Sequence, residues 1–219
     1  MNVARIAARL AVGALAAALA TSVVAVPGAQ AAGKAKPAGT KSLAQVLAKD
    51  KKGFDHNPRD FDVLTAAVRA VLAAKPASPV KVLADGKVPL TAFLPTDRAF
   101  QDLVRDITAA RKLPSERQAF AAVAGLGIGT VESVLLYHVV PGATVDRRAA
   151  LKANGARLAT ALGATVTVQV RSWHGYKLVY LADADTSDRN PRVVAFNLNV
   201  GNRQIAHAID RVLRPVDLP

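Results

Sequence analysis

The chain has 219 residues, enough for one domain with extensions, and 51% of them are hydrophobic, so a sizeable core can form. It contains no cysteine, which excludes disulfides, thiolate metal sites and cysteine nucleophiles and leaves packing to stabilise the fold. The formal net charge of +13 favours anionic partners such as acidic polysaccharides, wall polymers or phospholipid surfaces, although the same charge could simply keep the protein dispersed in solution.

Residues 1–31 are typical of a secretory signal peptide. Arg5 and Arg9 give a basic start, an apolar run follows over 10–26, and Ala-Gln-Ala at 29–31 has the small-x-small pattern of a cleavage site. An uncleaved membrane anchor is the alternative. The signal holds two of the 29 basic residues and none of the 16 acidic ones, so the mature chain keeps a net charge of +11. We therefore expect a secreted, extracellular protein with no membrane span after signal removal, for which nucleic acid is the least expected anionic partner.

Residues 32–40 are small or basic and have no periodicity, which predicts a disordered linker between the signal and a single domain over 41–219. Ser42 opens a Ser-x-x-Gln capping box, so the first helix of the domain should begin there. After a polar loop, Asp60 is placed to cap a second helix with an apolar stripe over 61–72.

Residues 90–94 predict a short strand that runs into Pro95, after which Thr96 is placed to cap a helix. Another capped helix is predicted from Ser115. The Gly-x-Gly-x-Gly run at 125–129 follows a helix instead of a strand, and no Gly-Lys-Ser/Thr follows it. It therefore predicts a connector between helices and not a phosphate-binding loop.

The segment 133–142 carries one histidine into an apolar helix face. Val131, Leu135 and His138 recur at helical spacing, and Pro141 pushes the residue before it out of the helical region. The sequence therefore predicts that His138 lies buried at a helix-to-strand corner.

From Arg157 onward the hydrophobic period changes from helical to two, which predicts strands separated by a hairpin turn at 172–175. Helices dominate the first two thirds of the mature chain and strands the last third. This segregation predicts an α+β fold instead of a doubly wound parallel sheet. The predicted late strands are 165–171, 176–181, 192–196 and 205–213.

The four histidines and sixteen acidic residues form no His-Glu-x-x-His, Gly-x-Ser-x-Gly or other pattern of catalysis or metal binding. We therefore predict no catalytic residue, no cofactor and no metal site. Residues 183–188 begin like a calcium loop, but Asp188 replaces the glycine at its sixth position and Val194 the glutamate at its twelfth. A solvated loop is the favoured interpretation, and weak calcium binding is the alternative.

Trp173 falls in the predicted hairpin turn. Its ring either folds back over the strand pair, which is the interpretation we favour, or stays exposed and stacks on a sugar ring as a partner contact.

Three further segments stand out, in this order: Thr91-Ala-Phe-Leu-Pro-Thr-Asp-Arg-Ala-Phe100, Leu135-Leu-Tyr-His-Val-Val-Pro-Gly142 and His207-Ala-Ile-Asp-Arg-Val-Leu-Arg-Pro215. Together they resemble the fasciclin domain of secreted adhesion proteins, and one copy covers about 41–219. The resemblance implies a wedge of β-strands packed with several α-helices, and a role in adhesion or in binding matrix and envelope components without enzymatic activity.

In animal members of this family, a Tyr-His pair and an Asp-Ile pair are associated with integrin adhesion. Tyr137 and His138 match the first pair, so they are candidate structural or adhesion residues. The Asp-Ile positions fall on Asn197 and Leu198, where the carboxylate is missing, and integrin binding is therefore not supported. Asn197, Leu198 and Trp173 are kept as candidate partner contacts.

These observations predict a secreted, non-enzymatic protein that binds a cell-envelope or matrix component, either an anionic polymer or a protein. The alternative is an extracellular ligand carrier or hydrolase with a pocket near His138 and His207, since His207 shares a strand face with apolar neighbours. Rings open to a cavity would favour chemistry, and rings satisfied by backbone groups would favour architecture.

A buried neutral imidazole must find hydrogen-bond partners. We predict that Tyr137 and His138 chiefly hold the helix-to-strand corner, with polar partners in the loop around Thr96 and Asp97.

Overall fold

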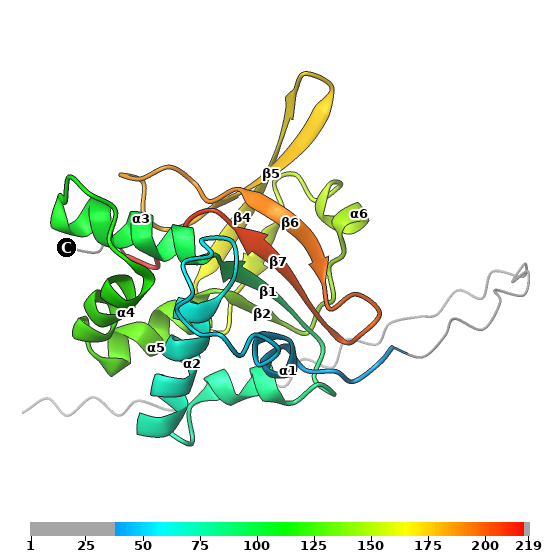
Figure 1. The fold of residues 1–219 in the computed structure, drawn as a ribbon. Coiled ribbons are helices and arrows are strands. Elements are labelled where there is room, and N and C mark those ends of the chain that lie inside the picture. The colour runs from blue at the N-terminus through cyan, green and yellow to red at the C-terminus, as the bar shows by residue number, and fades with distance from the viewer. Residues whose placement is uncertain (1–37, 217–219) are drawn as a thin grey trace, which may run out of the picture. The chain divides into compact units, whose positions relative to one another are not determined.

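The structure is a computed structural model that describes residues 38–216. The predicted signal peptide, 1–31, lies outside the described residues. The described residues form both helices and strands, so the predicted α+β fold is confirmed (Figure 1). In chain order the elements are α1 (Leu43–Leu47), α2 (Asp62–Ala74), the 3-10 helix η1 (Pro79–Ala84), β1 (Leu90–Pro95), α3 (Asp97–Thr108), α4 (Glu116–Gly125), α5 (Ile128–Tyr137), β2 (Val139–Pro141), α6 (Arg147–Ala150), β3 (Arg157–Ala159), β4 (Thr165–Trp173), β5 (Tyr176–Ala182), β6 (Val193–Leu198) and β7 (Gln204–Ile209).

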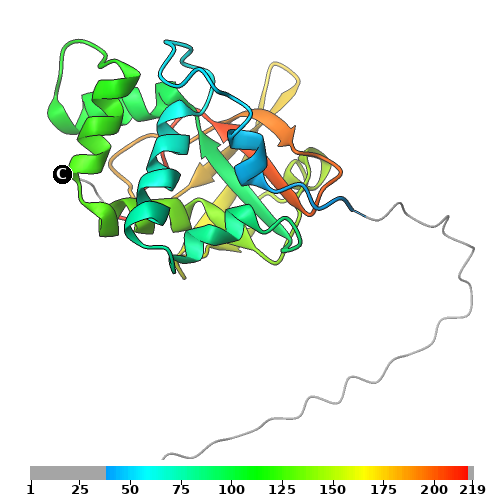
Figure 2. The same cartoon turned by 60° about the horizontal axis from the view of Figure 1, so that its bottom comes forward.

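A four-stranded sheet of order β2-β1-β7-β6 pairs a strand from the first half of the domain sequence with one from its C-terminal part. Its central pair, β1 and β7, is parallel, with Leu90 opposite Gln204 and Pro95 opposite Ile209. The strands β3-β4-β5 form a second, antiparallel sheet. Figures 1 and 2 show the helices of the first half gathered on one side of the four-stranded sheet.

Two hydrophobic cores lie on opposite faces of the central strands. Leu90, Ala92 and Leu94 of β1 belong to a core shared with the helices, whereas Phe93 belongs to a second core with residues of β4 and β5. Because both faces are covered, every residue of β1 and β7 is buried, and these strands show none of the alternation that marks a half-exposed strand.

The predicted helix caps at Ser42, Thr96 and Ser115 are all formed, and the two serines complete capping boxes. The predicted cap of α2 is wrong. Phe61 occupies the N-cap position in a non-extended conformation, and no side chain of its own turn caps the helix. Asp97 serves instead from the start of α3, 35 positions along the chain from Asp62, as described below.

The linker prediction for 32–40 is wrong at its C-terminal end, because Gly39 is hydrogen-bonded to the domain. The Gly39 N–H donates to the carbonyl of Gly201 over 2.8 Å, and the Arg203 N–H donates to the Gly39 carbonyl over 2.9 Å. A Cβ at Gly39 would lie 2.3 Å from the Asn202 side-chain oxygen, so a larger residue there would have to displace the Asn202 side chain.

Within residues 38–216, no single helix is long and apolar enough to cross a membrane. Only α4 and α5 taken together, with a bend of 108° between them, reach that length and composition.

Candidate functional site

The Tyr-His pair ends α5 and begins the corner to β2. Tyr137 is the last residue of the helix and is fully buried in the core between the sheets. Its hydroxyl donates to the carbonyl of Thr165 over 3.1 Å, which ties the end of α5 to the first residue of β4. Burial raises the pKa of Tyr137, so the phenol stays protonated and remains a donor.

Both ring nitrogens of His138 are hydrogen-bonded to backbone groups. Nδ1 lies 2.7 Å from the carbonyl of Val134, and the Leu213 N–H donates to Nε2 over 2.9 Å. Since Nε2 accepts, the single proton of the neutral ring must sit on Nδ1. A second proton would point at the Leu213 N–H, and burial lowers the pKa of His138 to about 4. The ring therefore joins α5 to the segment after β7 as a fixed neutral tautomer.

The prediction that Tyr137 and His138 have partners around Thr96 and Asp97 is wrong. The Thr96 hydroxyl caps α3, and both oxygens of Asp97 accept from backbone N–H groups at the start of α2. Those groups are therefore already engaged. The corner is held instead by Thr165, Val134 and Leu213, none of which lies in the predicted loop.

Both ring nitrogens of His207 are likewise hydrogen-bonded to backbone groups. The Asn197 N–H donates to Nδ1 over 3.2 Å, and Nε2 lies 2.8 Å from the carbonyl of Val145. The ring packs against Phe93 and Phe196, is almost fully buried, and has its pKa lowered by that burial. Both histidines thus have the geometry expected of residues that stabilise the fold, and not the free ring nitrogens expected in a reactive pocket.

Asn197 and Leu198 lie at the end of β6 and are half-buried. Asn197 has a positive φ of 63°, and its side-chain oxygen accepts from the Arg147 N–H at the start of α6 over 2.8 Å. Leu198 packs against the helix-side core. These contacts give both residues a structural role, and the partner contact stays a prediction.

The β4–β5 hairpin extends beyond the body of the domain (Figure 1). Two exposed aromatic side chains lie at its end. Trp173 is 62% exposed and pairs with Tyr176, which is 71% exposed. Between them His174 and Gly175 have φ values of 47° and 79°, as a two-residue type I′ turn requires. The favoured interpretation, that Trp173 folds back over the strands, is wrong, because its aromatic contact is the edge of the His174 ring, with centroids 4.4 Å apart.

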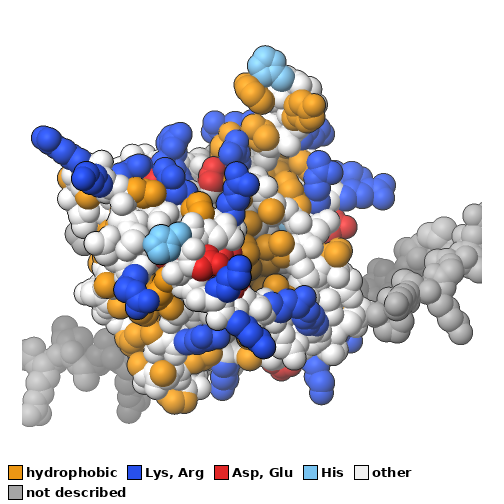
Figure 3. All heavy atoms as spheres, viewed as in Figure 1, with side chains coloured by type: hydrophobic (Ala, Val, Ile, Leu, Met, Phe, Trp, Pro, Cys, Tyr) orange, Lys and Arg blue, Asp and Glu red, His pale blue; other side chains and the backbone are white. Residues whose placement is uncertain are grey.

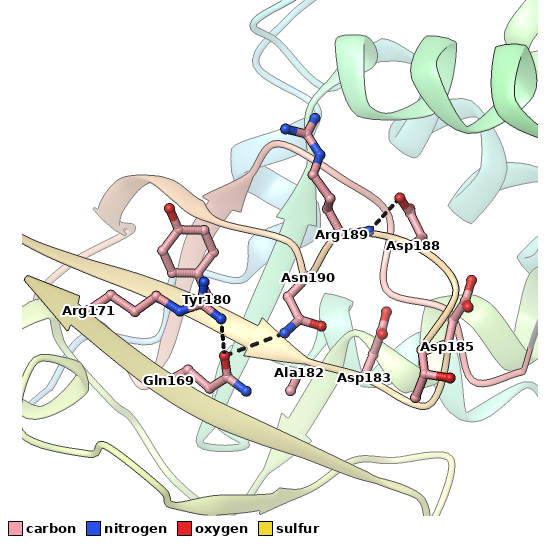
Figure 4. A pocket seen from close by; sticks show the side chains of 10 residues that line it. Gln169, Arg171, Tyr180, Ala182, Asp183, Asp185, Asp188, Arg189 and Asn190 are labelled. Atoms are coloured by element: carbon pink, nitrogen blue, oxygen red, sulfur yellow. Dashed lines mark hydrogen bonds between the residues drawn. The ribbon is translucent and has the colours of Figure 1, made fainter. Parts of the chain in front are cut away.

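A polar pocket of about 610 Å³ opens beside this hairpin (Figure 4). The guanidinium of Arg171 lies 4.9 Å from the centre of the Tyr180 ring and donates to the side chain of Gln169. Asn190 reaches the same Gln169 oxygen from the loop after β5. The pocket is lined by Gln169, Arg171, Tyr180, Ala182, Asp183, Asp185, Thr186, Asp188, Arg189 and Asn190.

The aspartates of this loop are held by arginines from the C-terminal segment. Arg214 lies 3.2 Å from the buried carboxylate of Asp185 and 3.2 Å from that of Asp188. Its backbone N–H also donates to Asp183, whose pKa is raised to about 6 by burial. The prediction of a solvated loop at 183–188 is therefore wrong. These carboxylates are engaged by protein groups and are not arranged as a calcium loop.

Aspartates and arginines both line the pocket, and two of its arginines have no acidic partner in the described part of the chain. Arg171 and Arg189 both line it, and no acidic side chain within residues 38–216 forms an ion pair with either. Such an arrangement can attract an anionic group. No motif in the sequence marks Arg171 as a site residue, although alternation along β4 places it on the face opposite the buried Val166 and Val168.

Comparison with known proteins defines the class. The family model described as the fasciclin domain matches residues 62–215, and the chain therefore belongs to the fasciclin domain family. This is a family of cell-adhesion type whose members occur in extracellular or cell-surface proteins and are generally non-enzymatic.

Among solved structures, the chain is similar to a FAS1 domain pair from the insect cell adhesion molecule Fasciclin I. The identity is 13% and the TM-score 0.43, and the match covers 68% of this chain and 44% of that one. The chain thus spans less than half the length of that domain pair. A search of curated proteins finds no match.

Proposed function

We propose that this fasciclin-domain protein acts outside the cell as a non-enzymatic adhesion protein, and that the end of the β4–β5 hairpin contacts an anionic component of the envelope or matrix. The observation that carries the proposal is the exposure of Trp173 and Tyr176 at the end of a projecting hairpin. Large rings left in water at one place are typical of a contact surface, because an aromatic ring buries 150–250 Å² when covered.

The charge around the hairpin supports an anionic partner. Arg171, Lys177 and Arg189 are exposed on or beside it. In Figure 3, Lys and Arg side chains are spread over the whole face shown, and hydrophobic side chains and a histidine cover the end of the hairpin. An aromatic platform with basic neighbours suits a sugar polymer that carries carboxylates or phosphates, because rings stack on the sugar while the cations bind its charges.

The alternative of a carrier or hydrolase centred on His138 and His207 receives no support from their geometry. All four ring nitrogens are engaged by backbone groups, and neither histidine lines the polar pocket beside the hairpin. A base or nucleophile activator needs a free nitrogen within reach of substrate.

The proposal is tested by retention of the mature protein on isolated cell envelopes. Replacing Trp173 and Tyr176 together with alanine should lower retention at least tenfold, and raising the salt concentration should weaken the wild-type interaction. Val200→Ala is the matched control, because Val200 is also 62% exposed but lies in the β6–β7 turn. Equal retention of the hairpin variant and the control would contradict the proposed surface.

Trp173 also gives a direct optical readout, because it is the single tryptophan of the chain. Its emission should change and saturate as acidic wall polysaccharide is added. An unchanged spectrum while the protein is retained would place the contact elsewhere.

A further inference from the structure

Five acidic side chains converge beside the N-terminus of α2, and we call them the acidic cluster: Asp55, Asp60, Asp62, Asp97 and Glu116. Carboxylate oxygens of Asp55, Asp62 and Glu116 lie within 4.8 Å of one another, and so do those of Asp60, Asp62 and Asp97. Asp62 belongs to both sets. The cluster joins the loop before α2, the first residue of α2, and the first residues of α3 and α4.

The acidic cluster has almost no balancing positive charge from the protein. Within residues 38–216 its one ion pair is between Asp55 and Lys52, at 3.8 Å. Basic residues outnumber acidic ones by 29 to 16 in the whole chain, so the local excess of acidic residues in the cluster is the opposite of the overall charge balance. Carboxylates this close repel one another unless protons or a cation neutralise them.

Several carboxylate oxygens of the acidic cluster are buried and have no hydrogen-bond partner in the part of the chain that the structure describes. Glu116 is 3% exposed and Asp62 is 7% exposed, yet Glu116 Oε1 and Asp62 Oδ2 have no partner among the described residues. Both oxygens of Asp60 are also buried and accept no N–H from the described residues, but they lie against the Asp97 carboxyl, whose pKa is raised to about 8 by burial and by this contact, so a proton shared by the two is the alternative to a cation there. Buried polar atoms are nearly always satisfied in folded proteins, so the Glu116 and Asp62 oxygens indicate a ligand.

We propose that the acidic cluster binds one calcium ion. The cluster offers only oxygen atoms, which hard cations prefer over nitrogen and sulfur. Three carboxylates from an irregular loop and helix starts, with water completing the shell, suit the six to eight oxygens and flexible geometry of calcium better than the strict octahedron of magnesium. An ion beside Asp62, the residue that both sets share, would join the start of α2 to the loop before it and to the start of a neighbouring helix.

Surface hollows give the ion a route inward. One of about 550 Å³ is lined in part by Asp60, and another of about 490 Å³ is lined in part by Asp62. An extracellular module of this kind binds calcium with a Kd of about 10⁻⁴–10⁻³ M. This affinity range depends on the proposed extracellular location, whereas the site itself does not.

Calcium titration of the chelator-treated protein tests the proposal. Calorimetry should show saturable binding of one ion, and about 10 mM calcium chloride should raise the melting temperature by about 5 °C over a sodium chloride solution of equal ionic strength. Magnesium chloride should give a markedly smaller rise.

Two isosteric variants locate the site. Glu116→Gln keeps an oxygen acceptor for the His56 N–H, which the wild-type carboxylate accepts over 3.0 Å, while it removes the charge. Asp60→Asn removes the charge of the side chain whose two oxygens lack partners. Each variant should weaken calcium binding at least tenfold. Asp210→Asn, in a partly exposed pair with Arg192, should leave it within twofold.

The outcomes separate this proposal from the adhesion proposal. Absence of binding to the wild-type protein at about 10 mM calcium would overturn the site, and so would unchanged affinity in both cluster variants. Neither result would bear on envelope retention by the hairpin.

Discussion

Replacing His138 with leucine removes two hydrogen bonds that join the end of α5 to the segment after β7. The Leu213 N–H would lose its acceptor in a buried position, which costs about 1–3 kcal/mol, and the Val134 carbonyl would lose a bond whose net contribution is about 0.5–1.5 kcal/mol. Leucine fills a similar volume, so little cavity term is added. We expect the free energy of unfolding to fall by about 3 kcal/mol.

This loss should lower the melting temperature by roughly 6–12 °C in a domain of this size, and it should lower the urea midpoint without changing the slope of the transition. His174→Leu is the control, because His174 is exposed in the hairpin turn and its replacement should change stability by less than about 0.5 kcal/mol. An unchanged midpoint for His138→Leu, combined with lost envelope retention, would show that His138 is a contact residue and would refute this reasoning.

Three further predictions concern the same scaffold. Tyr137→Phe removes the hydroxyl that donates to Thr165 and should lower stability by about 1–3 kcal/mol in urea unfolding, with retention on envelopes unchanged; no loss of stability would contradict the role of the hydroxyl. Arg214→Met leaves the buried carboxylate of Asp185 without its cation and should cost about 3–5 kcal/mol, whereas a cost below about 1 kcal/mol would mean that the pair behaves as an exposed one. The pKa of His138 is lowered to about 4 in the folded state from 6.5, so its contribution to stability is complete above pH 6.5 and is lost as the pH falls toward 4, by about 3 kcal/mol in total. The stability difference between the wild type and His138→Leu should therefore shrink over that range, and a constant difference would contradict the buried neutral ring.

Local signals in the sequence predicted what local interactions determine. Ser42 and Ser115 cap their helices through residues three positions away, and Thr96 caps α3 in the same way. Pro141 likewise marks the corner after His138 correctly. Each of these features depends on a spacing of three to five residues, which a sequence displays directly.

Long-range pairings account for what the sequence did not show. The parallel pairing of β1 with β7 joins residues more than 100 positions apart, and burial on both faces removes the alternation that would identify either strand. Asp97 caps a helix that precedes it by 35 positions, so Asp60 was the nearer but wrong choice.

The candidate site was predicted in part. The hairpin and the position of Trp173 at its end followed from alternation and the glycine, although the turn itself is only His174 and Gly175. Whether any other element covers the Trp173 ring depends on how far the hairpin extends beyond the core. The loop at 183–188 looked solvated because Arg214, which pairs with Asp185, lies 29 positions away. The acidic cluster escaped motif analysis for the same reason, since its members are spread over 55–116.

Retention on isolated envelopes, measured side by side for the hairpin double variant and for His138→Leu at a temperature where both are folded, tests the central claim most directly. We predict that replacing Trp173 and Tyr176 with alanine lowers retention at least tenfold, while His138→Leu binds as the wild type does. Full retention of the hairpin variant together with loss in His138→Leu would contradict the account and would place the contact at the Tyr-His corner.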